Sequence, residues 1–156
     1  MSIIVFDDTY FMRQALAEAQ KAFDQGEIPI GAVVVWNNRI IGRGYNQTET
    51  LQDPTAHAEI IAITAATQNI GAKYLSEATL YVTIKPCIMC IGASYWAKIK
   101  RIVWGAPEPK AGFMQFESIL HQYHKSLLYP KMEITSGVMA DQARELMQEF
   151  FRLRRQ

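Results

Sequence analysis

The order of apolar and polar residues predicts helices and strands that alternate along the chain. Apolar residues at helical spacing predict a first helix, capped by residues 7–9 and running to residue 24, and further helices over 54–68, 86–97 and 139–154. Runs rich in β-branched residues predict strands over 31–36, 39–45, 79–83, 100–104 and 132–135, with Gly105 ending the fourth. Between residues 106 and 130 the pattern weakens, and a short helix over 118–126 is the one element it suggests.

These elements together predict an α/β fold with three layers. Asn37-Asn38 separates the first two strands and is typical of a hairpin turn. The strand over 79–83, the helix after it and the strand over 100–104 form a crossover unit, so those strands should be parallel. We therefore expect a five-stranded mixed sheet with helices on both faces, and the helices over 54–68 and 86–97 side by side with converging N-termini.

Length and composition favour one soluble domain covering residues 1–156. Hydrophobic residues make up 49% and charged residues 20%, both ordinary for a globular protein. The two cysteines are too few for a disulfide framework and fit a reducing compartment, and no segment resembles a signal peptide or membrane span. We therefore expect a cytoplasmic protein without a membrane partner. The net charge of +1 neither requires nor excludes a nucleic-acid partner.

His57, Cys87 and Cys90 have the residue types and spacing of three zinc ligands. Cys87 and Cys90 are three residues apart, which places both thiols on one face of a helical turn. A tetrahedral Zn²⁺ with three protein ligands keeps a fourth position for water, as catalytic sites do. The sequence therefore predicts one catalytic Zn²⁺ per chain.

Helix starts are expected to support these ligands. Asp53 is the predicted N-cap of the second helix, with Pro54 at its first position, and Pro86 should open the third helix in the same way. A helix N-terminus favours thiolate over thiol. Two helix starts would then point at one metal.

Glu59 is the predicted catalytic residue. It lies two residues from His57, so the two side chains do not share a helix face, and Glu59 is not expected to be a fourth ligand. A carboxylate there can take a proton from water and deliver it to a substrate nitrogen. His-x-Glu and Cys-x-x-Cys are each common alone, but the combined H-x-E…P-C-x-x-C arrangement is the signature of zinc deaminases.

On these motifs the chain resembles the cytidine and deoxycytidylate deaminase superfamily, and within it the bacterial tRNA adenosine deaminases, which act at the wobble position. The resemblance covers nearly the whole chain and is carried by residues 27–35, 44–46, 53–59, 79–83, 86–90 and 150–156. It implies the three-layer deaminase fold and hydrolysis of adenosine to inosine with release of ammonia. Two departures weaken the match: Lys85 stands where those enzymes commonly carry Glu, and residues 106–130 lack their usual Gly- and Ser-containing stretch.

The resemblance also suggests which residues hold the base. Asn46 follows the second strand, and its amide can both donate to and accept from a base edge. Ile30 would form an apolar wall, the Ala58 N–H would bond the base, and Pro86 would lie beside it. These four residues are the predicted substrate contacts.

The C-terminal residues are the predicted contacts to RNA. Arg152, Arg154 and Arg155 either complement the dipole of the last helix or bind phosphates, and Lys110 is a further candidate. Of the adjacent Phe150 and Phe151, one should pack in the core while the other lines a groove in which bases can stack.

Assembly as a homodimer is expected as well. Apolar residues at Met89, Tyr95, Trp96 and 113–116 suggest a subunit interface, and the family resemblance implies a homodimer.

Two other functions remain open at this point. One is deamination of a free base or nucleoside, such as guanine or cytosine, and Tyr95-Trp96-Ala97 is similar to guanine deaminases. The other is a non-catalytic, zinc-stabilised RNA-binding module, against which Glu59 argues because a structural site needs no proton carrier.

Overall fold

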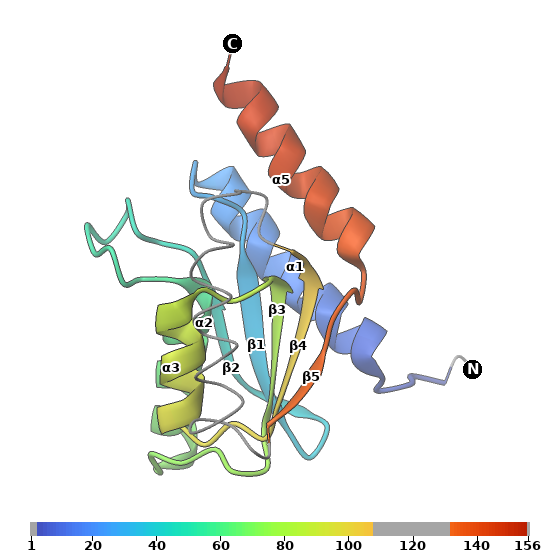
Figure 1. The fold of residues 1–156 in the computed structure, drawn as a ribbon, viewed down its shortest axis with the longest axis vertical. Helices are drawn as coiled ribbons and strands as arrows, with labels where there is room; N and C mark the ends of the chain where they lie inside the picture. Colours follow the sequence, from blue (N-terminus) through green and yellow to red (C-terminus); the bar gives the residue numbers. More distant parts are fainter. Residues whose placement is uncertain (1–2, 108–131, 156) are drawn as a thin grey trace.

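A computed structural model describes residues 3–107 and 132–155. Its five strands form one mixed sheet in the order β2-β1-β3-β4-β5 (Figure 1). They are β1 (Gly31–Trp36), β2 (Arg39–Tyr45), β3 (Thr79–Ile84), β4 (Arg101–Ala106) and β5 (Glu133–Thr135). β1 is antiparallel to β2 and β3, whereas β3, β4 and β5 are parallel to one another. The predicted mixed sheet and the parallel crossover are confirmed.

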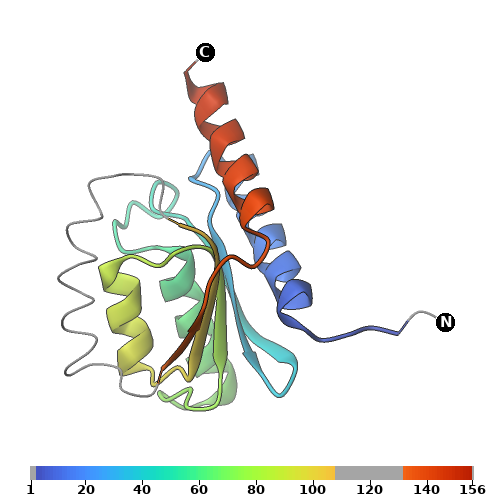
Figure 2. The same cartoon turned by 45° about the vertical axis from the view of Figure 1, so that its right-hand side comes forward.

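Helices cover both faces of the sheet, as predicted (Figure 2). They are α1 (Asp8–Asp24), α2 (Ala58–Ile70), α3 (Ile88–Trp96) and α5 (Ala140–Arg154). α1 and α5 lie on one face, and α2 and α3 lie side by side on the other. The fold has the three-layer α/β/α architecture that the sequence led us to expect.

The side chains of β1 point alternately to the two faces of the sheet, and those on both faces are apolar, which explains why both faces are covered. Ala32 and Val34 belong to the core under α2, together with Leu80 and Val82 of β3. Val33 and Val35 point the other way and pack against α1 with Phe11, Met12 and Ala15. Successive side chains of a strand point to opposite faces, so an unbroken apolar run fits a strand buried on both sides.

Several local predictions are confirmed by backbone geometry. Asp7 caps α1, and its carboxylate accepts from the Tyr10 N–H at 2.8 Å. Asn37 and Asn38 have φ angles of 50° and 58°, and a two-residue hairpin turn of type I′ requires positive φ at both central positions. Gly137 has a φ of 85° and directly precedes the turn at residues 138 and 139 that leads into α5.

The prediction for Gly105 is wrong. Gly105 lies inside β4, where a Cβ would stand 2.5 Å from the Thr83 carbonyl oxygen, so close packing rather than chain termination selects glycine. The predicted short helix over 118–126 and the apolar stretch 113–116 lie outside the described residues. No helix in the ranges that the structure describes combines the length and apolarity needed to cross a membrane.

Candidate metal and catalytic site

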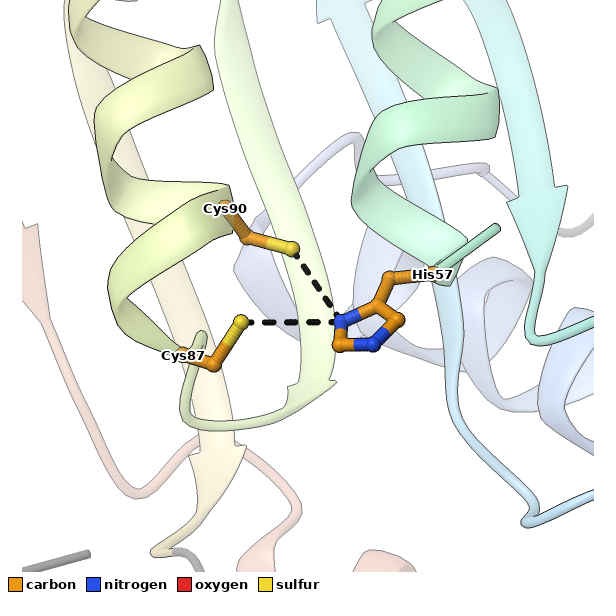
Figure 3. A group of neighbouring side chains, drawn as sticks. All are labelled: His57, Cys87 and Cys90. Carbon is orange, nitrogen blue, oxygen red and sulfur yellow. Dashed lines mark hydrogen bonds between the residues drawn. The ribbon is translucent and has the colours of Figure 1, made fainter. Parts of the chain in front are cut away.

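The three predicted zinc ligands meet where two helices begin (Figure 3). His57 is the N-cap of α2, Cys87 is the N-cap of α3, and Cys90 lies in the first turn of α3. The Nδ1 atom of His57 lies 3.5 Å from the Sγ atom of Cys87 and 3.5 Å from that of Cys90. All three ligand atoms lie within 4.8 Å of one another.

This donor set and its spacing fit a tetrahedral zinc ion. A nitrogen about 2.1 Å and a sulfur about 2.3 Å from the same tetrahedral Zn²⁺ lie about 3.6 Å apart. The two observed nitrogen–sulfur distances of 3.5 Å match that separation. Three protein ligands leave one position for water or substrate.

Both helices begin later than the sequence predicted. α2 starts at Ala58 rather than at Pro54, because Asp53 caps a local turn instead: its Oδ1 accepts from the Thr55 N–H at 2.8 Å and from the Thr55 hydroxyl at 2.7 Å. α3 starts at Ile88, so Pro86 precedes the N-cap rather than opening the helix. The predicted convergence of helix starts is nevertheless confirmed, since His57 and Cys87 are themselves the N-caps.

The electrostatics of the cysteine pair favour one thiolate. A hydrogen bond from Cys90 lowers the pKa of Cys87 to about 4, with a smaller contribution from His57. The same hydrogen bond, together with burial, raises the pKa of Cys90. Of the two cysteines, Cys87 is therefore the one that ionises more readily. It lies at a helix N-terminus, whose dipole favours negative charge.

Glu59 lies beside the cluster without joining it. It is the second residue of α2 and is 4% exposed, and it is absent from the group of three ligand atoms. Burial raises its pKa to about 7 from an ordinary 4.5. A carboxyl group that titrates near neutrality can both accept and donate a proton at working pH.

Comparison with known families identifies the fold and the chemistry. Residues 6–106 match the model of the cytidine and deoxycytidylate deaminase zinc-binding region. The chain belongs to this family. The resemblance predicted from the sequence is thereby confirmed, and the His57, Cys87 and Cys90 cluster is the part of the described chain suited to the zinc that the family's name specifies.

Several curated relatives are named tRNA-specific adenosine deaminases. That of Haemophilus influenzae is 44% identical over 96% of this chain and 86% of its own length. That of Agrobacterium fabrum is 40% identical over 94% of this chain and 95% of its own length. The chloroplastic tRNA(adenine(34)) deaminase of Arabidopsis thaliana is 41% identical, but the match covers only 12% of that much longer protein.

Two solved structures have a similar fold. A structure from a study of tRNA:A34 deaminases acting at the wobble position has a TM-score of 0.80 and 40% identity, and covers 88% of this chain and 99% of its own. A guanine deaminase from Nitrosomonas europaea has a TM-score of 0.76 at 20% identity, covering 95% and 86% of the two chains. The second likeness shows the fold alone.

The predicted substrate residues lie at or beside the ends of elements, and Ala58 and Pro86 adjoin the ligands His57 and Cys87 in sequence. Asn46 follows β2 and is 6% exposed; its Nδ2 donates to the Ile28 carbonyl at 3.3 Å. Its Oδ1 is buried and has no hydrogen-bond partner among the described residues. Ala58 is the first residue of α2, Pro86 is buried directly before Cys87, and Ile30 precedes β1 and is partly buried.

The C-terminal residues separate into different roles. Phe150 is buried and packs edge-on against Phe23, with ring centroids 6.0 Å apart, which confirms that one of the two phenylalanines is in the core. Phe151 instead lines a pocket of about 360 Å³ between α5 and the carboxyl ends of β3 and β4. Arg152 and Arg155 also line this pocket, although Arg152 pairs with Glu149 at 2.6 Å.

Arg154 does not share that pocket. Its guanidinium donates to the Gly26 carbonyl and stands 4.7 Å from the centre of the Phe150 ring. Lys110, the fourth predicted RNA contact, lies outside the described residues. Lys85 places its ammonium group 5.5 Å from the centre of the Trp104 ring.

Sequence reasoning missed Glu27 and Arg144. Glu27 is a buried acid whose carboxylate binds the loop before His57, and Arg144 is a third arginine at the α5 pocket. No periodicity marks Glu27, because it lies between elements. The available signals were an acidic residue directly before an apolar Ile-Pro-Ile segment and its place in residues 27–35, which carry the family resemblance.

Proposed function

We propose that this chain deaminates adenosine to inosine at the wobble position of tRNA. The reaction class is supported by the position of Glu59, a buried carboxyl group beside a three-ligand metal site. The substrate is supported by relatives named for tRNA, which are 40–44% identical over most of their length, against 20% for the guanine deaminase. Deamination of a free base or nucleoside, of the guanine or cytosine type, is the second candidate, favoured by the shared fold alone.

The reaction replaces the carbon–nitrogen bond at adenine C6 with a carbon–oxygen bond. Water adds at C6, the bond from C6 to the amino nitrogen breaks, and ammonia leaves, so no electron donor or acceptor is needed. Bound zinc lowers the pKa of water toward about 7. Glu59 would take one proton from water and pass it to the ring nitrogen beside C6, and would then carry a second proton from the new hydroxyl on C6 to the leaving amine. His57, Cys87 and Cys90 would hold the ion.

We assign Asn46 to the base edge. Its buried Oδ1 has no partner in the described structure, and a buried polar atom of this kind is costly unless a ligand or water satisfies it. An N–H of the base would supply the missing donor. As the first residue of α2, Ala58 has an N–H without an intrahelical acceptor and would bond the base as well. Ile30 and Pro86 would complete an apolar wall.

We assign the pocket beside α5 to the RNA strand. Phe151 offers a ring for stacking, and Arg152 and Arg155 offer guanidinium groups for phosphate. Single-stranded loops are recognised by this combination of stacking and charge. Lys110 remains a proposed contact on sequence grounds.

We also propose that the chain works as a homodimer in the cytoplasm. α3 is strongly apolar, yet Cys90 and Ser94 are its only buried residues, while Ile88 is exposed and Trp96 is 76% exposed. An exposed apolar helix face is typical of a subunit interface. A monomeric mass at micromolar concentration together with full activity would contradict the dimer. The cytoplasmic location is supported by two free cysteines, which are placed so that they could hold a metal and are not paired as a disulfide.

Ammonia release from a set of substrates tests the function. The purified zinc protein is incubated with an anticodon stem-loop carrying adenosine at the wobble position, and separately with guanine, cytosine, adenosine and cytidine. Release from the stem-loop, absent in Glu59→Gln, is the expected result. Release from free guanine with none from RNA would establish the second candidate, and RNA binding without any release would indicate a binding module.

A further inference from the structure

Glu27 is a buried acid outside the metal site, and both of its oxygens bind a single loop. Its side chain is among the least exposed in the protein, at 1% for the residue. Oε1 accepts from the Glu49 N–H at 3.1 Å and Oε2 accepts from the Thr50 N–H at 2.8 Å. A carboxylate that bridges two successive backbone N–H groups fixes the conformation of that backbone.

The loop that Glu27 holds joins the proposed base contact to the metal ligand. It begins after Asn46 and ends at His57, and its two ends are tied by a bond from the Gln47 N–H to the Ala56 carbonyl at 3.0 Å. Glu49 and Thr50 lie in the first half of this loop, and both residues are exposed to solvent although their N–H groups bond Glu27. The loop therefore connects two parts of the site, and the Glu27 carboxylate anchors it to the body of the protein.

The residues that follow Glu27 hold Asn46 directly. The Ile28 carbonyl accepts from Asn46 Nδ2 at 3.3 Å, and the Ile30 carbonyl accepts from the Asn46 N–H at 3.0 Å. One short segment, residues 27–30, thus fixes both the proposed base contact and the loop beyond it. A shift of this segment would move Asn46 and the loop together.

We propose that Glu27 is a positioning residue for the substrate base: it holds the loop over residues 47–56 so that Asn46 and that loop meet the nucleotide in one fixed arrangement. The inference rests on the proposed function for the identity of the substrate. Glu27 itself touches neither the base nor the metal ligands in this assignment. Its replacement should weaken substrate binding more than it slows the chemical step carried by Glu59.

Glu18 offers a matched control. It is also a buried glutamate, 2% exposed, and its carboxylate accepts from Lys21 at 2.9 Å and lies 3.4 Å from Arg43. It lies on α1, and among the described residues its carboxylate partners are Lys21 and Arg43 rather than the loop. Glu27→Gln and Glu18→Gln therefore remove the same buried charge from two places, one on the loop anchor and one away from it.

The test combines amide hydrogen exchange with steady-state kinetics on the stem-loop. In Glu27→Gln, exchange at the Glu49 and Thr50 amides should accelerate, and kcat/KM should fall between about 10-fold and 100-fold, mostly through KM, because small misplacements cost that much. Zinc content should not change. Glu18→Gln should keep normal exchange at both amides and a normal KM.

Three results would overturn the proposal. They are unchanged exchange and kinetics in Glu27→Gln, an equal loss in both variants, and a loss confined to kcat. Should Glu27→Gln not fold, Glu27→Asp keeps the charge but is too short to reach both amides, and the same criteria apply to it. An inactive wild type would reject the proposed function, while the exchange data would still decide whether Glu27 anchors the loop.

Discussion

Gly44 of β2 lies so close to Ala58, the first residue of α2, that a Cβ at Gly44 would stand 2.4 Å from the Ala58 carbonyl oxygen. Gly42 makes a similar approach to the Ala62 carbonyl, at 2.2 Å. The backbone of α2 therefore rests directly on β2. This contact sets the position of His57 and Glu59, which flank Ala58, relative to Asn46 at the end of the same strand.

Gly44→Ala should displace the start of α2 and disturb the metal site. Backbone atoms cannot move aside as a flexible side chain does, so we expect the free energy of unfolding to fall by about 2 kcal/mol or more, with reduced zinc content. Gly92→Ala is the control, because a Cβ there meets no described atom within 4 Å, and alanine is favoured over glycine within a helix by about 1 kcal/mol. Denaturant unfolding and elemental analysis measure both effects. Equal stability of the two variants would contradict this account of the contact.

Removing a thiol ligand should release zinc. Cys87→Ala leaves only His57 and Cys90 of the three ligand atoms, so the variant should purify with well under one zinc per chain and without activity. Ser94→Ala is the control on the same helix, since the Ser94 hydroxyl donates to the Cys90 carbonyl at 2.8 Å and lies outside the ligand group. It should keep both zinc and activity. A fully active Cys87→Ala protein would rule out the ligand assignment.

Glu59→Gln should separate metal binding from proton transfer. Because Glu59 lies outside the ligand group, the variant should fold and retain zinc. An amide cannot carry the proton, so kcat should fall by about 10²–10⁴-fold. Single-turnover assays on the stem-loop and elemental analysis give the two answers. Loss of zinc would make Glu59 a ligand, and near-normal turnover would reject its role as the proton carrier.

Asp8 should make stability depend on pH in the acid range. Its carboxylate accepts from Arg101 at 2.6 and 2.8 Å and from the Tyr81 hydroxyl at 2.8 Å. The hydrogen bonds from Arg101 are the main reason that its pKa lies below the ordinary 3.8. A depressed pKa stabilises the fold above the unfolded value, and this stabilisation is lost as pH falls through the lower, folded value.

Asp8→Asn should therefore lower the free energy of unfolding by about 2 kcal/mol at pH 7, and the difference from wild type should shrink below pH 3.8. Urea unfolding across that range measures it. The control is Asp141→Asn, whose exposed pair with Arg144 should contribute under about 0.5 kcal/mol. A difference that stays constant with pH would show that Asp8 acts through packing rather than charge.

The sequence was sufficient to predict the described helices and strands and the group of possible metal ligands. It failed where local signals compete. Asp53 and Pro54 are genuine helix-start signals, but here they form a turn that delivers His57 to the N-cap. Gly105 is selected by close packing across the sheet, which one strand's sequence does not reveal. The role of Glu27 depends on two backbone N–H groups more than 20 residues away, and such contacts cannot be recognised from the residue types.

Arg155 and Arg154 should differ in how they affect binding of RNA, although they are neighbours. Arg155 lines the α5 pocket, where phosphate contact would release counterions, whereas Arg154 donates to the Gly26 carbonyl. For Arg155→Gln, the slope of log KM against log salt concentration should become shallower by about 0.7, the value for one phosphate contact on a single strand. For Arg154→Gln the slope should match wild type, and any loss should be the same at every salt concentration. The two variants remove the same charge at the same end of α5, so a general effect of charge would change both slopes alike. That outcome, or two unchanged slopes, would remove Arg155 from the RNA-binding surface.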